Sequence, residues 1–591
     1  MNNAQGEAGL LAWEEHCCGA ARKFLMNAVV IDNEPFVPVL SRPAQTQEAE
    51  MLDDGMGVVL NEFDEEEEGE EQNGSESQGR EIGGHELDIR SVSDAFAADG
   101  IACAFVLPDD GDEDEEAICS RVLNAASASD IVVIDWHLRR KSADLTKKIL
   151  TELAQHDAAE SGRMRLICVY TGETVLDAVT RDAIAVLEAG GMNFTDKKLD
   201  EGAGRGEHNL LLVLNKRDVA SAQLPERLIR EFSALADGLL PAFSLAAVAA
   251  IRRNVHHIAT RFSAELDAAY VANRLITDPP GDVAELIREL FVSECDTALG
   301  LERVADNYLE PEQLKSWLAA RGQPQSKQKF GKEEMQISAN FLIGLADGRV
   351  DGEKSIAFMG DGKEFEFKEN ARQQISRALH KGKNQDEIKG KSIDTERQFA
   401  RFVALKREAF GGNKLISGEG WKPSLTLGTI VARDVQVEGS DGPEMEKEFY
   451  YCLTPACDTV RANNEVRRFL FLRLSIAKNA KEKGNLIIAI DGSNSEKLFV
   501  DPRPSKISVF DFKGDAELGR VIATKVEDSD GKNPQFKFVA VDDTASDFEW
   551  LGEVRGIRAQ RDMTDLNREW LRFGILDSEY LRLASKKSAA L

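Results

Sequence analysis

The sequence predicts a multidomain protein, in which an N-terminal α/β domain with a five-stranded parallel sheet precedes a helical middle region and a C-terminal α+β module. The chain has 591 residues, enough for several domains of ordinary size. Short apolar runs alternate with helical periodicity in the first third, and Ala/Leu-rich helical periodicity dominates the middle. The last part carries apolar runs separated by turn signals such as SDG and DGSN.

Five apolar runs in the first third are expected to form the strands of one sheet. They are apolar along nearly their whole length, which is typical of strands buried on both faces of a parallel sheet. Helical segments fall between most of them, as parallel pairing requires. The predicted strands are 28–31, 101–107, 130–138, 165–171 and 209–215, and the predicted helices are 87–98, 117–126, 145–156 and 174–188.

Changes in composition along the chain set the expected domain boundaries. Polar, Glu/Gly/Ser-rich stretches cannot form a core, so we interpret them as insertions or linkers. The expected regions are an N-terminal helix over 1–25, an α/β domain over 26–220 with acidic insertions at about 40–84 and 108–116, a helical bundle over 221–322, a linker over 322–331 and an α+β module over 332–591.

The C-terminal module is expected to mix helices with turn-separated strands. Its β-branched and aromatic runs predict strands, and its amphipathic stretches predict helices. The predicted helices are 336–345, 371–380, 563–572 and 578–585, and the strand candidates include 448–453, 485–490, 506–512 and 535–541.

The charge balance excludes some classes of partner. There are 73 basic and 103 acidic residues, which gives a formal net charge of −30. Residues 64–71 and 109–116 each hold seven acids in eight positions, and we interpret both runs as solvated loops. A chain this acidic is a poor candidate for generic binding to nucleic acid or to an anionic membrane.

The apolar runs and the cysteines indicate the expected compartment. No apolar run approaches the roughly 18–20 residues of a membrane span, and the first residues carry acids where a signal peptide would be basic. The eight cysteines are scattered along a long chain, unlike those of a disulfide scaffold. We therefore expect a cytoplasmic protein with free thiols that binds neither membrane nor nucleic acid.

Polar residues stand where the predicted strands end, and in open parallel sheets the carboxyl ends of the strands hold the functional residues. Asp135 is a potential nucleophile toward a phosphoryl group. Asp32 adds negative charge that attracts Mg²⁺, Thr171 can donate to a phosphoryl oxygen and Lys216 can pair with another. With Asn33, these are the parts of a phosphoaspartate site.

The ordered segments VVID, IVVID, ICVYT and LLVLNK resemble the strand ends of a response-regulator receiver domain over about residues 26–220. The phrases VIDNEPF, IDWHL and YTGE, with the long insertions, are similar to the atypical receivers of bacterial two-component-like anti-phage systems of the Detocs type. The resemblance implies a flavodoxin-like fold, with Asp135 as phosphoacceptor, Thr171 as switch hydroxyl and Lys216 as the phosphate-pairing lysine. It also implies an Mg²⁺ cofactor, held by Asp32, Asn33, Asp135 and the backbone carbonyl of His137.

Two features depart from the receiver pattern. Receivers usually carry two adjacent acids after the first strand, whereas here Asn33 follows Asp32, and an amide oxygen binds Mg²⁺ more weakly than a carboxylate does. Lys197, in the segment MNFTDKK, competes with Lys216 for the phosphate-pairing role. Lys216 is favoured because LLLVL makes a better buried strand than MNFT, but the alternative stays open.

The sequence thus predicts a receiver-like protein that accepts a phosphoryl group on Asp135 from a sensor histidine kinase. It would signal to a downstream effector, or buffer phosphate, in a bacterial relay with an anti-phage role, and a homodimer is compatible with this function. One alternative is a receiver-controlled effector enzyme, whose site in the C-terminal module would gather carboxylates around Asp458 or Asp491. Another is a degenerate receiver that acts only as an interaction module.

The C-terminal module carries no recognisable catalytic motif, and Cys452 and Cys457 are interpreted as small hydrophobic residues.

Overall fold

The structure is a computed structural model of the whole chain. The residues it describes are 2–37, 86–108, 114–139, 142–160, 162–206, 208–278, 281–321, 326–330, 333–337, 342–343, 356–360, 363–367, 371–406, 422–439, 442–477, 486–491, 494–526, 535–541 and 547–570. The chain divides into two compact units, one formed by Ala12–Ala249 and the other by Met1–Leu11 together with Ala250–Leu591. The predicted insertion at 40–84 lies outside the described residues, as does most of the second acidic run.

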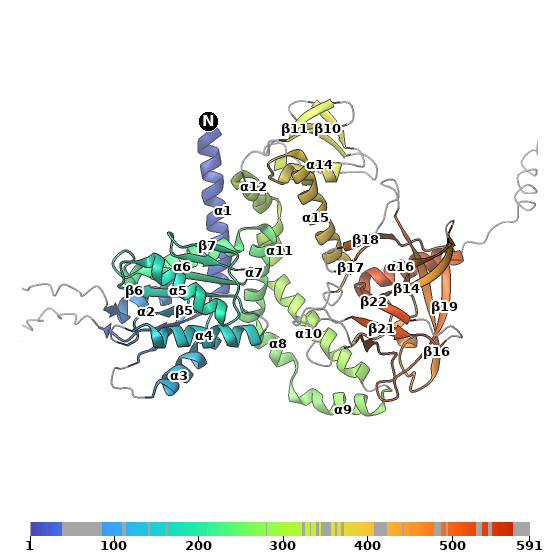
Figure 1. Cartoon of the computed structure of the whole chain (residues 1–591), viewed down its shortest axis with the longest axis horizontal. Coiled ribbons are helices and arrows are strands. Elements are labelled where there is room, and N and C mark those ends of the chain that lie inside the picture. The colour runs from blue at the N-terminus through green and yellow to red at the C-terminus, as the bar shows by residue number, and fades with distance from the viewer. Residues whose placement is uncertain are drawn as a thin grey trace, which may run out of the picture. The chain divides into compact units, whose positions relative to one another are not determined.

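A parallel α/β sheet forms the centre of the first unit (Figure 1). In the described part of this unit the strand order is β4-β1-β5-β6-β9-β8-β7, and the first five strands pair in parallel. The neighbours β1 and β5 are the point where the strand order reverses, which is where ligands bind in such sheets. The parallel strands are β4 (Ala102–Val106), β1 (Asn27–Ile31), β5 (Ile131–Ile134), β6 (Arg165–Thr171) and β9 (Asn209–Asn215).

The predicted count of five strands is too low, because a hairpin extends the sheet to seven strands among the residues described. Strands β7 (Asp196–Lys198) and β8 (Ala203–Arg205) are antiparallel to each other, and β8 is antiparallel to β9. Both are short and polar, so they lack the apolar run that marks a buried strand. Gly202 joins them at φ +66°, where an added Cβ would lie 2.6 Å from the carbonyl oxygen of Val213. The hairpin therefore needs glycine at that position.

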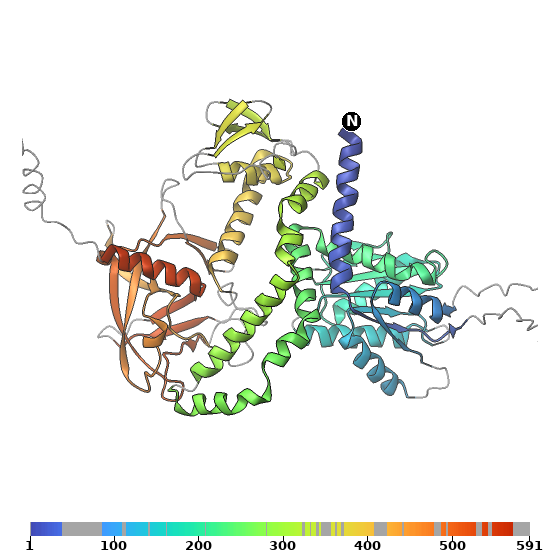
Figure 2. The ribbon, with the colours of Figure 1, turned by 180° about the vertical axis from the view of Figure 1, so that it is seen from behind.

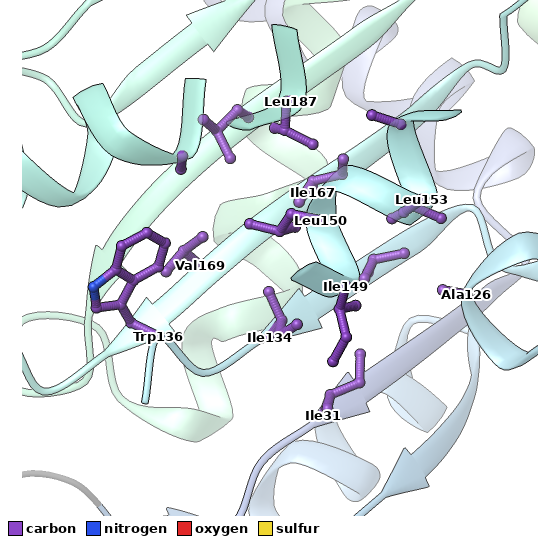
Figure 3. Packing of buried hydrophobic residues seen from close by; sticks show 14 of the residues in the cluster. Ile31, Ala126, Ile134, Trp136, Ile149, Leu150, Leu153, Ile167, Val169 and Leu187 are labelled. Carbon is purple, nitrogen blue, oxygen red and sulfur yellow. The ribbon is translucent and has the colours of Figure 1, made fainter. Parts of the chain in front are cut away.

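Helices cover both faces of this sheet. One face packs against α3, α4 and α5 through the hydrophobic cluster that Figure 3 shows around Ile134, Ile149 and Val169. On the other side α2 and α6 lie next to each other, and α6 contacts β6. The helices of this unit are α2 (Ile89–Ala98), α3 (Glu115–Ala128), α4 (Asp144–Ala159), α5 (Leu176–Ala189) and α6 (Leu224–Ser233), while α1 (Asn2–Phe24) and α7 (Leu239–Arg253) continue into the second unit.

Aspartates cap two of these helices. The carboxylate of Asp88 accepts the backbone N–H of Ser91 at the start of α2, and that of Asp114 accepts two N–H groups at the start of α3. Such caps satisfy backbone donors that have no partner within the helix. A two-stranded sheet of β2 (Pro35–Phe36) and β3 (Leu87–Asp88) precedes α2.

The second unit begins with helices, as expected for the middle of the chain. Residues 336 and 337, predicted to begin a helix, instead end strand β11 (Glu333–Ile337), which pairs with β10 (Ser326–Phe330) in the predicted linker. The predicted helix at 371–380 corresponds to α14, and 578–585 lies outside the described residues. The helices are α8 (Val255–Arg261), α9 (Asp267–Ile276), α10 (Gly281–Leu301), α11 (Val304–Leu309), α12 (Pro311–Ala320), α14 (Ala371–Leu379), α15 (Gln385–Ala404) and α16 (Gly556–Trp570).

Among the described helices, none by itself combines the length and the apolar character of a membrane span. One pair of helical segments, Ser221–Ala236 and Leu239–Arg253, passes the test of length and composition only when joined, and it is bent by 120°.

The rest of the second unit is rich in strands. In the described part, six of them close into a barrel, namely β14, β15, β16, β19, β21 and β22. Among the residues that the structure describes, a nine-stranded sheet runs β17-β18-β16-β15-β14-β22-β21-β20, with β19 paired to β16. A bridge between Phe512 and Ala540 then joins β19 to the end of β21. The strands are β14 (Thr429–Gly439), β15 (Gly442–Cys452), β16 (Val466–Ile476), β17 (Leu486–Asp491), β18 (Asn494–Phe499), β19 (Ile507–Lys513), β20 (Thr524–Lys525), β21 (Phe536–Val539) and β22 (Asp547–Glu553), and a separate hairpin holds β12 (Ile356–Gly360) and β13 (Lys363–Phe367).

Aromatic side chains fill the barrel. Phe471, Phe512 and Phe548 are fully buried, and their ring centroids lie 5.6–6.3 Å apart. The guanidinium of Arg433 lies 5.3 Å from the ring centroid of Tyr450, a cation–π distance. The interior is thus a packed core, as in other small barrels.

A hydrogen bond from Tyr450 supports a charged cluster beside this core. The Tyr450 hydroxyl donates to Glu448 at 2.6 Å, and Arg433 donates to the same carboxylate at 3.1 Å. Replacing Tyr450 by phenylalanine should lower the free energy of unfolding of the barrel by about 1–2 kcal/mol, since one hydrogen bond to a charged group is lost. Urea unfolding of the full chain checks this, and an unchanged barrel transition would contradict it.

Candidate functional site

The carboxyl ends of four parallel strands bring the predicted site residues to one edge of the first unit's sheet. Asp32 directly follows β1 and Asp135 directly follows β5, and these strands pair in register up to Ile31 and Ile134. Thr171 ends β6, and Lys216 directly follows β9. The backbone N–H of Lys216 donates to the carbonyl oxygen of Thr171 at 2.8 Å. Backbone pairing alone therefore places these residues near one another.

A buried ion triad forms the centre of the site. The ammonium of Lys216 lies 2.7 Å from Asp32 Oδ2 and 2.5 Å from Asp135 Oδ2. The three side chains are only 4%, 2% and 6% exposed, respectively. Two carboxylates share one ammonium here, so the triad carries a net negative charge in a place that water hardly reaches.

The electrostatics of the triad appear in the pKa values of its members. Burial raises the pKa of Asp32 to about 6; Lys216 opposes this rise and the charge of Asp135 adds to it. Burial alone would lower the pKa of the Lys216 ammonium, but Asp135 and Asp32 together raise it above its usual value. The lysine is thus held in its charged form, while the carboxylate pair retains uncompensated negative charge.

Backbone groups fix the direction of both carboxylates. The N–H of Glu34 donates to Asp32 Oδ1 at 2.8 Å, and the N–H of His137 donates to Asp135 Oδ1 at 3.0 Å. The Thr146 hydroxyl, in the first turn of α4, donates to the Asp135 carbonyl oxygen at 3.0 Å. In each carboxylate Oδ1 is held by the local turn and Oδ2 faces Lys216, so the pair is preorganised.

Glu173 ties together the three loops that carry Asp135, Thr171 and Lys216. Its Oε1 lies 2.9 Å from Nε2 of His137, two residues after Asp135. Its carbonyl oxygen accepts from the side-chain amide of Asn215 at 2.6 Å, and its N–H donates to Thr171 Oγ1 at 3.2 Å. We call the contacts of Glu173 with His137 and Asn215 the loop clasp. Sequence reasoning missed it; the only signal was that Glu173 and Asn215 stand beside predicted strand ends.

Comparison with known proteins assigns this part of the chain. Residues 24–221 match the family model described as "Response receiver domain". This region is a receiver domain. Neither the search of curated proteins nor the search of solved structures gave a match. The match to the family model shows that the chain has a response-regulator-like, phosphoryl-accepting region. A receiver domain implies interaction with a phosphodonor such as a kinase.

Two other predicted residues of the receiver domain, Asn33 and Lys197, lie in different parts of it. Asn33 is half-buried in the turn after β1. Lys197, the competitor of Lys216, lies on β7, where its ammonium is 2.6 Å from Glu188 at the end of α5. The structure thus places Lys216, and not Lys197, against the two aspartates.

The charge and the oxygen ligands of the predicted metal site in the receiver domain suit a divalent cation. The described residues contain no cluster of three or more His, Cys, Asp or Glu side chains that could hold a metal ion. The predicted ligands are different, because they combine two carboxylates with an amide oxygen and a backbone carbonyl, all hard oxygen donors that Mg²⁺ accepts. Two buried carboxylates face a single ammonium, so one negative charge is left that a cation would offset.

The residues singled out in the C-terminal module do not form a comparable site as far as the structure describes their side chains. Cys452 is fully buried in the aromatic core of the barrel, which fits its interpretation as a small hydrophobic residue. Cys457 is exposed, and its thiol lies 3.6 Å from Asp458. The side chain of Asp491 lies outside the described residues.

Proposed function

We propose that the receiver domain accepts a phosphoryl group on Asp135 from a partner sensor histidine kinase. The observation that carries this proposal is the contact of one buried ammonium, Lys216, with both Asp135 and Asp32. An isolated aspartate at a strand end is more often a turn residue. A carboxylate held by its own turn, beside a charged lysine and a second carboxylate, is equipped for phosphoryl transfer.

The transfer follows from the positions of these groups. A carboxylate oxygen of Asp135 attacks the phosphorus of the donor, the bond from phosphorus to the donor atom breaks, and the donor leaves with that electron pair. The product is an acyl phosphate on Asp135. The ammonium of Lys216 then exchanges a contact with the carboxylate for one with a phosphoryl oxygen, and so offsets the added negative charge.

Mg²⁺ is the cofactor that fits this role, and Asp32, Asn33, Asp135 and the carbonyl oxygen of His137 would hold it. When bound, it supplies positive charge that neutralises the transferring phosphoryl group. Asn33 offers a neutral oxygen where a second acid would offer a charged one, so we expect weaker metal affinity than two adjacent acids would give. Calorimetric titration with Mg²⁺, comparing wild type with Asn33→Asp, measures this difference.

Thr171 is proposed as the switch residue. Its hydroxyl accepts from the N–H of Glu173, and a rotation of the side chain toward Asp135 would break this contact and let the hydroxyl donate to a phosphoryl oxygen. That exchange would move Glu173 and loosen the loop clasp, which gives the β6–α5 loop two states that phosphorylation biases. The output would be a signal to a downstream effector. A receiver that shows no such loop change on phosphorylation would instead serve as a phosphate buffer.

The loop clasp gives a prediction about rate. Replacing Glu173 by alanine is expected to speed phosphorylation of Asp135 by acetyl phosphate about three- to tenfold, because it removes a negative charge near the path of an anionic donor and breaks the side-chain contact of the loop clasp with His137. Phosphate incorporation measured against time checks this. Glu188→Ala is the matched control, since it breaks a similar ion pair with Lys197 on the hairpin edge. Equal rates for Glu173→Ala and wild type would contradict the gating role.

The anti-phage setting rests on the sequence resemblance alone. If the relay has that role, Asp135→Asn should change the efficiency of phage plating on cells that carry the protein with its kinase. Plating efficiency that is the same for Asp135→Asn, wild type and cells without the gene would remove the anti-phage role while leaving the phosphoryl transfer untouched.

A further inference from the structure

The helices α9 and α10 form a hairpin that exposes an apolar stripe. Figures 1 and 2 show α9 leading into the start of α10, and the two helices contact each other. Leu275 and Ile276 near the end of α9 are 80% and 85% exposed. We call the following six exposed residues of this hairpin the hairpin stripe: Val271, Leu275, Ile276, Leu286, Leu290 and Phe291.

Helix α9 cannot be stable without a surface to pack against. It has ten residues, and none of them is buried. An isolated helix shorter than about 12–15 residues is marginal in water even with favourable composition, because helix stability in proteins comes from burying one face. Val271 and Leu275 are four positions apart, as are Leu286 and Leu290, so each pair lies along one side of its helix. Phe291 contacts the ring of Phe262 at 5.8 Å between centroids, but all six residues of the stripe remain largely exposed in the described part of the chain.

The size of the stripe matches one side of a dimer interface. At roughly 150–200 Å² for a fully exposed side chain of this size, the exposed parts of the six residues amount to about 600 Å². That is the upper end of the largest apolar patch on a typical monomer, which is about 300–600 Å². A standard interface takes about 800 Å² from each partner, of which up to about 65% is apolar, or about 500 Å².

A stripe that is apolar throughout suits a second copy of the same chain. Its six residues are uncharged, and they lie on the two contacting helices of one hairpin. In a two-fold interface the same patch meets itself, so the apolar stripe of one copy would be covered by the same stripe of the other. Two helical hairpins that pack in this way form a four-helix bundle, the arrangement in which such stripes are normally buried.

We propose that the protein is a homodimer in which the hairpin stripes of two copies pack against each other. The packing covers α9, which gives that helix the buried face it lacks in one chain. This inference is independent of phosphoryl transfer at Asp135, since it would hold for a receiver domain that carries no phosphate.

Sedimentation velocity of the full chain over a range of concentrations tests the proposal. Wild type is expected to sediment as a dimer. The double variant Leu275→Glu/Leu290→Glu should raise the dimer dissociation constant at least about 100-fold and sediment as a monomer, because it buries four charges without partners in each dimer. Leu518→Glu is the matched control, as this leucine is 58% exposed on the same unit but lies outside the hairpin, and it should leave the dimer intact.

A second variant separates loss of the interface from loss of the helix. Leu275→Ala/Leu290→Ala keeps helix propensity while removing most of the apolar area, so it should weaken the dimer with little loss of helical circular dichroism. A wild type that stays monomeric would overturn the proposal. A dimer that survives both double variants would also overturn it. The same holds if the amides of α9 are equally protected from hydrogen exchange in monomer and dimer, because part of the same chain, or nothing, would then cover the stripe.

Discussion

Replacing Lys216 by methionine is expected to slow phosphorylation of Asp135 about 10²–10³-fold. The ammonium of Lys216 lies 2.7 Å from Asp32 and 2.5 Å from Asp135, and it is the cation that these buried carboxylates share. Removing one preorganised electrostatic partner of a reacting group typically costs a factor of this size. Methionine keeps most of the length and apolar contact of the side chain, so the effect reports the charge.

The rate of phosphate incorporation from acetyl phosphate, followed by intact mass, measures this effect. Lys197→Met is the matched control, because Lys197 pairs with Glu188 on the hairpin and has no contact with the triad. Its rate should equal that of wild type within about twofold. A large loss of rate for Lys197→Met with a small loss for Lys216→Met would show that Lys197, and not Lys216, is the phosphate-pairing lysine.

Replacing Asp157 by alanine is expected to lower the free energy of unfolding of the receiver domain by about 3–5 kcal/mol. Arg165 opens β6 with a side chain that is 0% exposed, and its Nε lies 2.7 Å from Asp157 Oδ2. Its Nη1 also donates to the carbonyl oxygen of Ala126 at 2.6 Å. Burial lowers the pKa of Arg165 to about 10, so the guanidinium stays charged at neutral pH. Without Asp157 it becomes a buried charge without its counter-ion, which is the costly case.

Thermal unfolding of the full chain, with hydrogen exchange of β6 amides as the local readout, measures the effect of Asp157→Ala. Asp182→Ala is the control, since its pair with Lys147 is half-exposed and should contribute less than about 1 kcal/mol. The double variant Asp157→Leu/Arg165→Met should recover most of the loss, because apolar residues of similar volume can replace a buried ion pair. An Asp157→Ala protein as stable as wild type would contradict this account of the pair.

The sequence was sufficient to predict the five parallel strands of the receiver domain and the edge at which the triad residues meet, for a physical reason. Buried parallel strands such as Asn209–Asn215 must be apolar along their length, and their carboxyl ends must meet at one edge. Asp32, Asp135 and Lys216 therefore had to lie near one another once their strands were assigned. The β7–β8 hairpin could not be found in this way, because it is short, polar and held by pairing with β9.

Features that depend on side-chain contacts between distant segments were beyond sequence reasoning. The loop clasp needs the rotamer of Glu173 and the path of two other loops, and neither leaves a periodic pattern. The Asp157–Arg165 pair looked like an ordinary helix residue and an ordinary strand start, and only the burial of both shows its importance. In the barrel, Arg433 and Glu448 interrupt apolar runs, but the structure pairs them across β14 and β15.

Intact mass of the full chain after incubation with Mg²⁺ and acetyl phosphate tests the central claim most directly. The account predicts a gain of one phosphoryl group, about 80 Da, in wild type and no gain in Asp135→Asn. The adduct should be lost at alkaline pH, as expected for an acyl phosphate. An adduct that remains in Asp135→Asn, or a wild type that gains no mass from acetyl phosphate and none from a phosphorylated histidine kinase, would contradict Asp135 as the phosphoacceptor.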